Sequence, residues 1–428
     1  MYSYIKANIS SAILSIPKGV YMAGYGQRDE PNKGTHDDIY TKALTVSNGE
    51  KTIIIISNDL LGVNEDIVKK VVLGINKEIN ILEEDIFVCA THTHAAPDIF
   101  DWEFDQRFST CEANKKAKEY IINAIIKNAL NSTKELKPVK LAFGRSKCDK
   151  IASNRINKDW PIDDMVNGIF LIKENDCLLS AIVNYACHAT VLGADNLYIS
   201  ADYPGIVQKL IEEHFGKECT CMFINGACGN QSTRFTRKSQ NFDEVKRLGN
   251  ALYESVLESY DNREYIDDIT INSVKAYFDF PRKELPSREE ALKHLETMAR
   301  RLNRAKDEGV TQEELREAIT KHQGAMITLK LIDVLHRLDL IIPIQLMKLG
   351  DILITGIPVE LFSDYGILIK EKSSFSYTII AGYTNGMVGY VYTPESYKQG
   401  DYEAWSSPFD KHTGDFIVEK VVELMKIL

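Results

Sequence analysis

The sequence predicts an α/β fold, a mixed β-sheet core flanked by helices, with an inserted helical hairpin. Residues 51–59, KTIIIISND, form a continuous β-branched run, which is typical of a strand buried on both faces. A helical pattern from Glu65 to about Asn80 follows, and then a second apolar run, DIFVCA. This strand, helix, strand order predicts a parallel βαβ unit. The hairpin is predicted for residues 283–336, where dense charge with helical periodicity replaces the strand pattern.

The chain has 428 residues and no Pro-, Gly- or Ser-rich linker, so we expect one domain over residues 1–428 that contains the hairpin. Its 44% hydrophobic and 26% charged residues are ordinary for a globular protein. The formal charge of -10, without a long basic run to offset it, argues against a nucleic-acid partner. The oligomeric state is undetermined by the sequence, and a homo-oligomer stays open.

The N-terminal stretch lacks a basic region followed by a long apolar run, and no segment has the roughly 20 apolar residues that cross a bilayer. We therefore expect a cytoplasmic protein without a transmembrane segment. Eight cysteines are scattered along the chain, several of them inside apolar runs. This distribution is typical of reduced, buried thiols rather than of a disulfide framework.

The remaining elements follow from the same two periodicities. Apolar runs predict strands at residues 139–144, 168–173, 178–185, 219–225, 339–349 and 351–356. Amphipathic patterns predict helices at residues 111–131 and 202–214, the latter with Asp202 as its N-cap. In the hairpin, Ser287 with Glu290 and Thr311 with Glu314 have the spacing of capping boxes that start two helices.

Polar side chains follow several of the predicted strands. The strand DIFVCA runs into Thr91-His92-Thr93-His94, and side-chain alternation predicts that His92 and His94 point to the same side. Such a pair can supply two zinc ligands, or one ligand and one acid/base group, or it can be a surface pair without function. His188 and Glu360 also end apolar runs, and Asp59 is a candidate either to orient a metal-bound histidine or to cap a helix.

Taken together, these stretches resemble the catalytic domain of the neutral, non-lysosomal ceramidase family. The matching pieces are THTHAAP, SNR, NYACHAT followed by SADYPG, GNQS, GIPVEL, and GYVYTPESY with Asp401-Tyr402-Glu403-Ala404 behind it. They occur in the family's order and span Gly24 to about Ala404. Each piece is weak alone, but their common order is hard to reach by chance.

The resemblance implies a zinc amidase whose Zn²⁺ ligands fall on His92, His188, Glu360 and Tyr390. It further implies an acid/base role for His94 and an active-site role for Tyr402, and it puts Arg155 near the substrate carbonyl or the product acid. Ser232 falls where the family's GDxSP motif has its serine. That motif reads GNQST here, with Asn230 in place of the acid and Thr233 in place of the proline, and the resemblance offers Ser232 as a candidate catalytic residue.

The expected function is thus zinc-dependent cleavage of the amide bond of a small N-acyl substrate by metal-activated water. Two other readings compete with it: a zinc-dependent ester, lactone or phosphoester hydrolase, and a non-catalytic binding protein stabilised by its metal. Retention of both His94 and Tyr402 argues against the binding protein, because a purely structural site needs neither. The sequence does not name the substrate, since apolar residues that line a pocket look like core residues.

Overall fold

The computed structural model describes residues 5–100 and 111–428, apart from the side chains of residues 312 and 313. Its largest sheet has the strand order β11-β9-β8-β6-β1-β3-β4-β5, with β13 paired to β6. The strands are β1 Ile5–Ile13, β3 Tyr40–Ser47, β4 Thr52–Asn58, β5 Ile86–Ala90, β6 Lys137–Lys147, β8 Met165–Lys173, β9 Leu178–Tyr185, β11 Thr220–Asn225 and β13 Glu264–Ile266. The pairs β4/β5 and β9/β11 are parallel and the others antiparallel, so the sheet is mixed as predicted.

A second, smaller sheet packs against the first. Its strands follow the order β14 Ile271–Asp279, β15 Ile341–Leu349, β16 Ile352–Gly356 and β18 Tyr377–Ala381. In β4, Ile53 and Ile55 point into the core between the two sheets, whereas Ile54 and Ile56 point toward the helices. This alternation explains why the sequence of β4 is apolar at every position, because both of its faces are buried.

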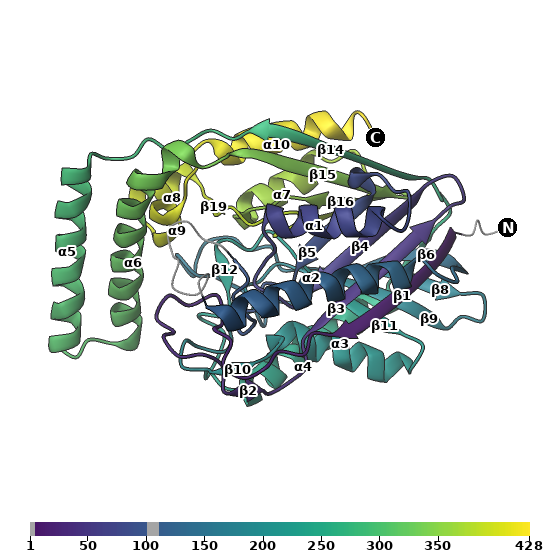
Figure 1. The fold of residues 1–428 in the computed structure, drawn as a ribbon, viewed down its shortest axis with the longest axis horizontal. Coiled ribbons are helices and arrows are strands. Elements are labelled where there is room, and N and C mark those ends of the chain that lie inside the picture. The colour runs from purple at the N-terminus through teal and green to yellow at the C-terminus, as the bar shows by residue number, and fades with distance from the viewer. Residues whose placement is uncertain (1–4, 101–110) are drawn as a thin grey trace.

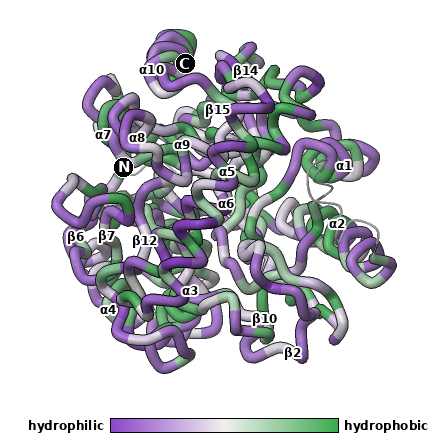
Figure 2. Tube along the Cα trace, turned by 90° about the vertical axis from the view of Figure 1, so that its left-hand side faces the viewer, coloured by the Kyte–Doolittle hydropathy of each residue, from purple (hydrophilic) through white to green (hydrophobic). Residues whose placement is uncertain are grey.

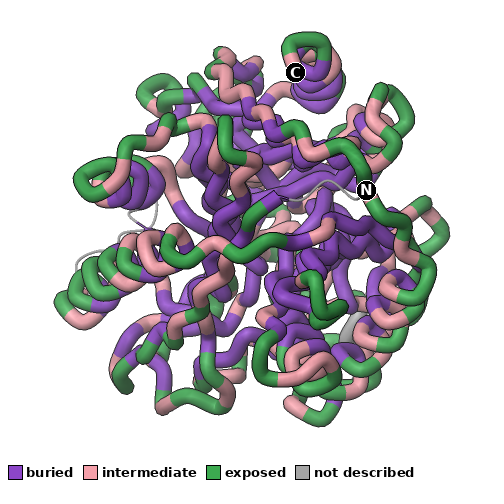
Figure 3. The backbone as a smooth tube through the Cα atoms, turned by 90° about the vertical axis from the view of Figure 1, so that its right-hand side faces the viewer, coloured by how far each residue is buried: buried purple, intermediate pink, exposed green. Residues whose placement is uncertain are grey.

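Helices cover the outer faces of both sheets, which gives four layers (Figure 1). Along the large sheet lie α1 Glu65–Asn76, α2 Glu112–Ser132, α3 Asp202–Phe215 and α4 Phe242–Asp261. Against the small sheet lie α7 Ser363–Lys372 and α10 Thr413–Met425. Seen from the end that holds both termini, buried backbone fills the middle and exposed backbone forms the rim (Figure 3).

The predicted hairpin region folds as two helices, α5 Arg288–Asp307 and α6 Gln312–Val334, that stand out from the layered body (Figure 1). Both predicted capping boxes are present at their N-termini. Helix α6 packs on α9 Tyr402–Ser406, which follows α8 Pro394–Gln399. Short 3-10 helices at Glu83–Asp85 and Leu335–Arg337 complete the helical elements of the described chain. Within these residues, no helix combines the length and apolar character needed to span a membrane.

Three short strand pairs connect the loops around the candidate site: β10 Tyr198–Ile199 with β2 Gly34–Thr35, β12 Gln231–Ser232 with β7 Ser153–Asn154, and β17 Glu360–Leu361 with β19 Tyr390–Val391. The two ends of the large sheet's strand order also approach each other. The Asn225 side chain, at the end of β11, donates to the Thr91 carbonyl after β5 at 3.0 Å. As a result, loops that follow strands distant in the sheet lie side by side.

Candidate metal centre

The loops after β5 and β9 carry His92, His94 and His188 to one place. A parallel bridge joins Thr93 to Ala189, and the His94 N–H donates to the Ala189 carbonyl at 3.3 Å. The histidine nitrogens that face one another all lie within 4.8 Å, and this group of three could hold a metal ion. The sequence placed these histidines at strand ends, and the approach of β11 to β5 brings them together.

The sequence suggested that strand alternation brings His92 and His94 together. In the structure a turn brings them together instead. Strand β5 ends at Ala90, and His92 has a φ of 66° in the left-handed region. A non-glycine residue holds that conformation only where its surroundings require it. Here the His92 N–H donates to the Leu60 carbonyl at 2.9 Å, which fixes the turn.

Backbone carbonyls orient all three imidazole rings. Each Nδ1 atom lies within hydrogen-bond distance of one: Leu61 at 2.7 Å for His92, Gly24 at 3.0 Å for His94, and Cys228 at 2.8 Å for His188. A carbonyl only accepts hydrogen bonds, so each Nδ1 must carry the proton. In a neutral imidazole the lone pair is then on Nε2, and the Nε2 atoms are the ones that face the centre.

The Nε2 atoms and one carboxylate oxygen approach one another closely. The Nε2 atoms of His92 and His94 are 3.2 Å apart. The Glu360 Oε2 atom lies 3.1 Å from Nε2 of His188 and 3.5 Å from Nε2 of His92. Ligands on a tetrahedral zinc ion with bonds near 2.0 to 2.1 Å are about 3.3 Å apart, so these separations suit a shared cation.

The protonation states agree with a cation site. Burial, followed by the charge of His92, lowers the pKa of His94 well below its usual value, and burial lowers the pKa of His188 to about 3. Burial alone would raise the pKa of Glu360, but the contacts with His188 and His92 hold it well below its usual value. Two neutral imidazoles and a carboxylate at pH 7 offer lone pairs and negative charge, which a divalent cation would balance.

The other residues implied by the resemblance surround this centre. Tyr390 pairs with Glu360 across β17 and β19, and its ring lies 5.3 Å from the Arg155 guanidinium carbon and 5.9 Å from the Tyr402 ring. Arg155 donates through Nε to Glu403 at 2.7 Å. Burial and then the charge of Glu360 raise the pKa of Tyr402 to about 12, so its phenol keeps its proton at neutral pH.

Ser232 lies beside the centre rather than in it. It forms a parallel bridge with His188, and its hydroxyl accepts from the Arg234 N–H at 3.2 Å. Among the described residues, that hydroxyl makes no hydrogen bond with the three histidines. A catalytic role for Ser232 stays a prediction.

Two acidic residues have other roles than those considered from the sequence. Asp59 accepts from the Tyr40 N–H at 2.9 Å and from the Gln208 side chain at 3.2 Å, and Asn64 is the residue that caps α1. Asp202 is the first residue of α3 and not its N-cap. Its carboxylate accepts from the N–H groups of Tyr203 at 2.7 Å and Leu192 at 3.2 Å, which holds the loop after His188 against the start of that helix.

Sequence reasoning missed Tyr383. Its ring stacks on His92 with centroids 3.8 Å apart, and its hydroxyl lies 3.5 Å from Glu360 Oε2. Tyr383 also has a positive φ, of 56°, which no sequence signal indicated. The backbone at Gly24 approaches this centre closely, because a Cβ there would lie 2.5 Å from Nδ1 of His94. The carbonyl that orients His94 therefore requires glycine.

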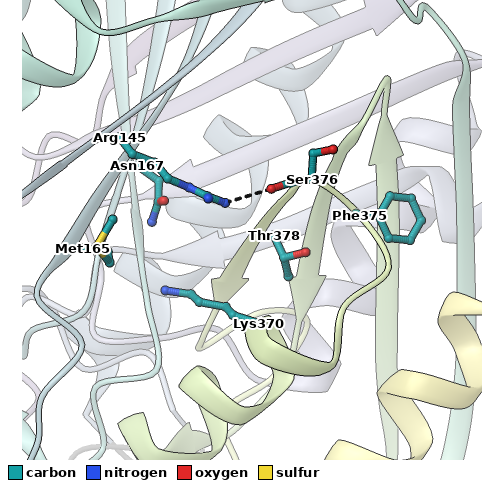
Figure 4. Close-up of a pocket in the computed structure, with 7 residues that line it drawn as sticks. All are labelled: Arg145, Met165, Asn167, Lys370, Phe375, Ser376 and Thr378. Atoms are coloured by element: carbon teal, nitrogen blue, oxygen red, sulfur yellow. Dashed lines mark hydrogen bonds between the residues drawn. The ribbon is translucent and has the colours of Figure 1, made fainter.

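A cavity of about 190 Å³ elsewhere between the two sheets has a different lining. Arg145 reaches across it to the Ser376 carbonyl at 3.3 Å, and the Lys370 side chain is part of its lining (Figure 4). Lys370 also donates to Asp163 at 2.5 Å. None of the predicted site residues is part of this lining as described. The histidine centre is thus separate from the cavity.

Comparisons with known proteins bear on the whole chain. The family model described as "Neutral/alkaline non-lysosomal ceramidase, N-terminal" matches residues 13–220. A neutral ceramidase of Pseudomonas aeruginosa is 20% identical over 455 residues, covering 92% of this chain and 67% of the relative. A neutral ceramidase of Mycobacterium tuberculosis is 20% identical over 475 residues, covering 95% of this chain and 74% of the relative.

Solved structures show the same fold. The crystal structure of the Pseudomonas aeruginosa neutral ceramidase superimposes on all of this chain and 75% of its own, with a TM-score of 0.76 at 19% identity. A structure described as "Ceramidase complexed with C2" covers 99% of this chain with a TM-score of 0.78 at 17% identity. Sequence motifs in the family's order, the family model over residues 13–220 and these relatives agree in relating the chain to the neutral/alkaline, non-lysosomal ceramidase family.

Proposed function

We propose that this chain is a zinc-dependent amidohydrolase that cleaves the amide bond of an N-acyl substrate, as the names of its ceramidase relatives suggest. The observation that carries the proposal is the convergence of three imidazole Nε2 atoms and the Glu360 carboxylate, with every Nδ1 proton already donated to a carbonyl. When bound, zinc supplies Lewis acidity, which polarises a carbonyl and makes a water molecule more acidic.

His92, His188 and Glu360 would hold the ion, with Tyr390 beside them. The first two are almost completely buried, at 1% and 0% exposure, and Glu360 is 5% exposed. His94 is only half-buried, so its ring would be accessible to a substrate. Its neutral Nε2 is able to accept a proton from water and return it to the leaving amine, as a general base and then a general acid.

Arg155 and Tyr402 would stabilise charge on the substrate carbonyl. The Arg155 Nη2 atom is buried and, among the described residues, has no hydrogen-bond partner. A guanidinium donor left open in this way suits an oxyanion or the carboxylate of the product acid. Tyr402 is protonated at neutral pH and provides a second donor.

The test is to measure the metal content of the purified wild type beside His92→Ala, and then hydrolysis of a panel of N-acyl amides, ceramide included, with and without chelator. We expect about one zinc per chain, lost in the variant, because a catalytic site has few ligands to spare. Amide cleavage should disappear with chelator and return with added zinc. If neither protein binds zinc when it is supplied, the ligand set and the hydrolase proposal are both wrong.

A further inference from the structure

Two arginines from distant parts of the chain, Arg237 and Arg316, act through their charges on Tyr25, which contacts His94 in the histidine centre. The Tyr25 ring is tilted against the His94 ring with centroids 5.1 Å apart, and its hydroxyl donates to the Leu192 carbonyl at 2.7 Å. The charges of Arg237 and Arg316 both act on the pKa of Tyr25, which burial raises to about 12. Both guanidinium charges therefore act on the side chain that contacts the ring of the proposed acid/base residue.

Arg237 lies in the segment that follows β12, and Arg316 lies on helix α6. The Nη1 group of Arg237 donates to the Thr190 carbonyl at 2.7 Å, and Thr190 follows His188 by two residues. Arg316 comes from α6, the inner helix of the hairpin. That helix meets the loop of Tyr25, because a Cβ on Gly26 would lie 4.0 Å from the Gln323 side chain. Figure 2 shows the molecule from the side on which the hairpin stands out in Figure 1, and α5 and α6 lie near the middle of that view.

Neither arginine has a carboxylate partner. Arg155 pairs with Glu403, and Arg301 on α5 pairs with Glu317, but no ion pair joins Arg237 or Arg316 to an acid in residues 5–100 and 111–428. Both are half-buried. Burial, followed by the charge of Arg316, lowers the pKa of Arg237 to about 10. The buried carboxylate that opposes this effect is Asp202, whose oxygens already accept two backbone N–H groups.

Unpaired positive charges that are half-buried and close together destabilise a fold, so a protein keeps them where they bind something. A third arginine, Arg28, adds to the positive field, since its guanidinium carbon lies 5.1 Å from the Tyr25 ring and it donates to three backbone carbonyls. Guanidinium groups match the oxygens of carboxylates, sulfonates and phosphates in shape and charge.

We propose that Arg237 and Arg316 form an anion-binding subsite beside the reaction centre, and that the substrate carries an anionic group within a few atoms of its scissile amide bond. This inference rests on the proposed amidohydrolase function and narrows it. Ceramide has no charge and would leave both arginines without an anionic partner among the described residues. N-acyl amino acids and other anionic N-acyl compounds fill the subsite.

The first arm of the test compares two substrates of the same length, N-dodecanoylglycine and the uncharged N-dodecanoylethanolamine. We expect the wild type to favour the anionic substrate in kcat/KM by about tenfold or more, as expected for a charge-assisted hydrogen bond. Arg237→Gln and Arg316→Gln should each remove most of that preference through KM and leave the uncharged substrate within about twofold. Arg300→Gln is the control, because Arg300 is exposed on α5 and outside the cluster.

The second arm measures binding without turnover. The ketone analogue of dodecanoylglycine, in which a CH2 group replaces the amide N–H, is titrated into the zinc-supplied wild type and the three variants by calorimetry. We expect about tenfold weaker binding in Arg237→Gln and Arg316→Gln and none of this loss in Arg300→Gln. Unchanged thermal midpoints show that the variants are folded.

The two arms separate the possible failures. Amide cleavage without a preference for the anion, or an equal loss for both substrates in the variants, overturns the subsite and leaves the amidohydrolase standing. Arginine-dependent binding of the ketone without any amide cleavage supports the subsite and overturns the function proposed above. Ketone binding that is equal in all four proteins overturns the subsite whatever the activity.

Discussion

The histidine centre and the α5–α6 hairpin are held in place in opposite ways. In the centre, carbonyls from three separate loops fix three imidazole rings. The histidines themselves follow the buried strands β5 and β9. In the hairpin, each helix starts with its own capping box, and α5 has a single fully buried residue, Ala291. The reacting groups thus depend on the whole core, whereas the hairpin depends on local sequence and a few contacts.

This difference separates chemistry from selectivity. Geometry within a few tenths of an ångström is needed where a proton moves, and a packed core supplies it. A helix that packs on α9 through Gly324 and carries Arg316 can change its side chains without disturbing the strands. We expect substitutions in the centre to abolish turnover and substitutions in the hairpin to change stability little.

The largest contrast is expected from His94→Ala beside Leu302→Ala in α5. Loss of the acid/base group should lower kcat by about 10² to 10⁴, the usual contribution of such catalysis, with zinc still bound by the remaining ligands. Leu302→Ala should leave kcat within about twofold. Turnover and metal content are measured on the same preparations. Loss of the metal together with turnover in His94→Ala would show that His94 is a ligand.

The next contrast is in stability. Ile55 lies between the two sheets at 0% exposure, so Ile55→Ala should lower the free energy of unfolding by about 2 to 5 kcal/mol. Leu302 is half-buried, and Leu302→Ala should cost less than about 1 kcal/mol. Urea titrations of both variants provide the values. Equal losses would mean that the hairpin is part of the cooperative core.

The elements predicted well from the sequence are those set by local patterns. The run of isoleucines fixes β4, and the spacing of Ser287 to Glu290 fixes the start of α5. The position of each strand within the sheet is not set by such a local pattern. Strand β1 sits in the middle of the large sheet, yet its sequence, IKANISSAI, alternates weakly and gave no prediction.

Within the centre, residue types were predictable and their placement was not. His92 and His188 stand in recognisable motifs, but their partners are the carbonyls of Leu61 and Cys228, which every residue possesses. Backbone acceptors leave no trace in a sequence. Tyr383 was missed for a similar reason, since its stacking on His92 depends on a turn formed far along the chain.

Alkaline pH should destabilise the sheet core and spare the hairpin, which contains no cysteine. Burial raises the pKa of the Cys89, Cys219 and Cys228 thiols to about 12. Above about pH 9 the unfolded chain loses these protons and the folded chain keeps them, so each thiol lowers the unfolding free energy by about 1.4 kcal/mol per pH unit. Urea titrations at pH 8 to 10 under reducing conditions measure how steeply the unfolding free energy falls with pH. In Cys89→Ala this slope should be smaller by the contribution of one thiol, about 1.4 kcal/mol per pH unit. An unchanged slope in Cys89→Ala would contradict this account.

The smallest effect compares the same defect in the two regions. Ser287 caps α5 and Asn64 caps α1, each by accepting a backbone N–H, at 3.3 and 3.0 Å. Alanine at either position should cost about 1 kcal/mol. Because α1 packs on the core through Ile67 and Val71, Asn64→Ala should lower the global unfolding free energy. Ser287→Ala should instead leave the urea midpoint unchanged and speed amide exchange about fivefold in the first turns of α5, since that helix opens locally. A lower midpoint in Ser287→Ala would show that the hairpin unfolds together with the sheets.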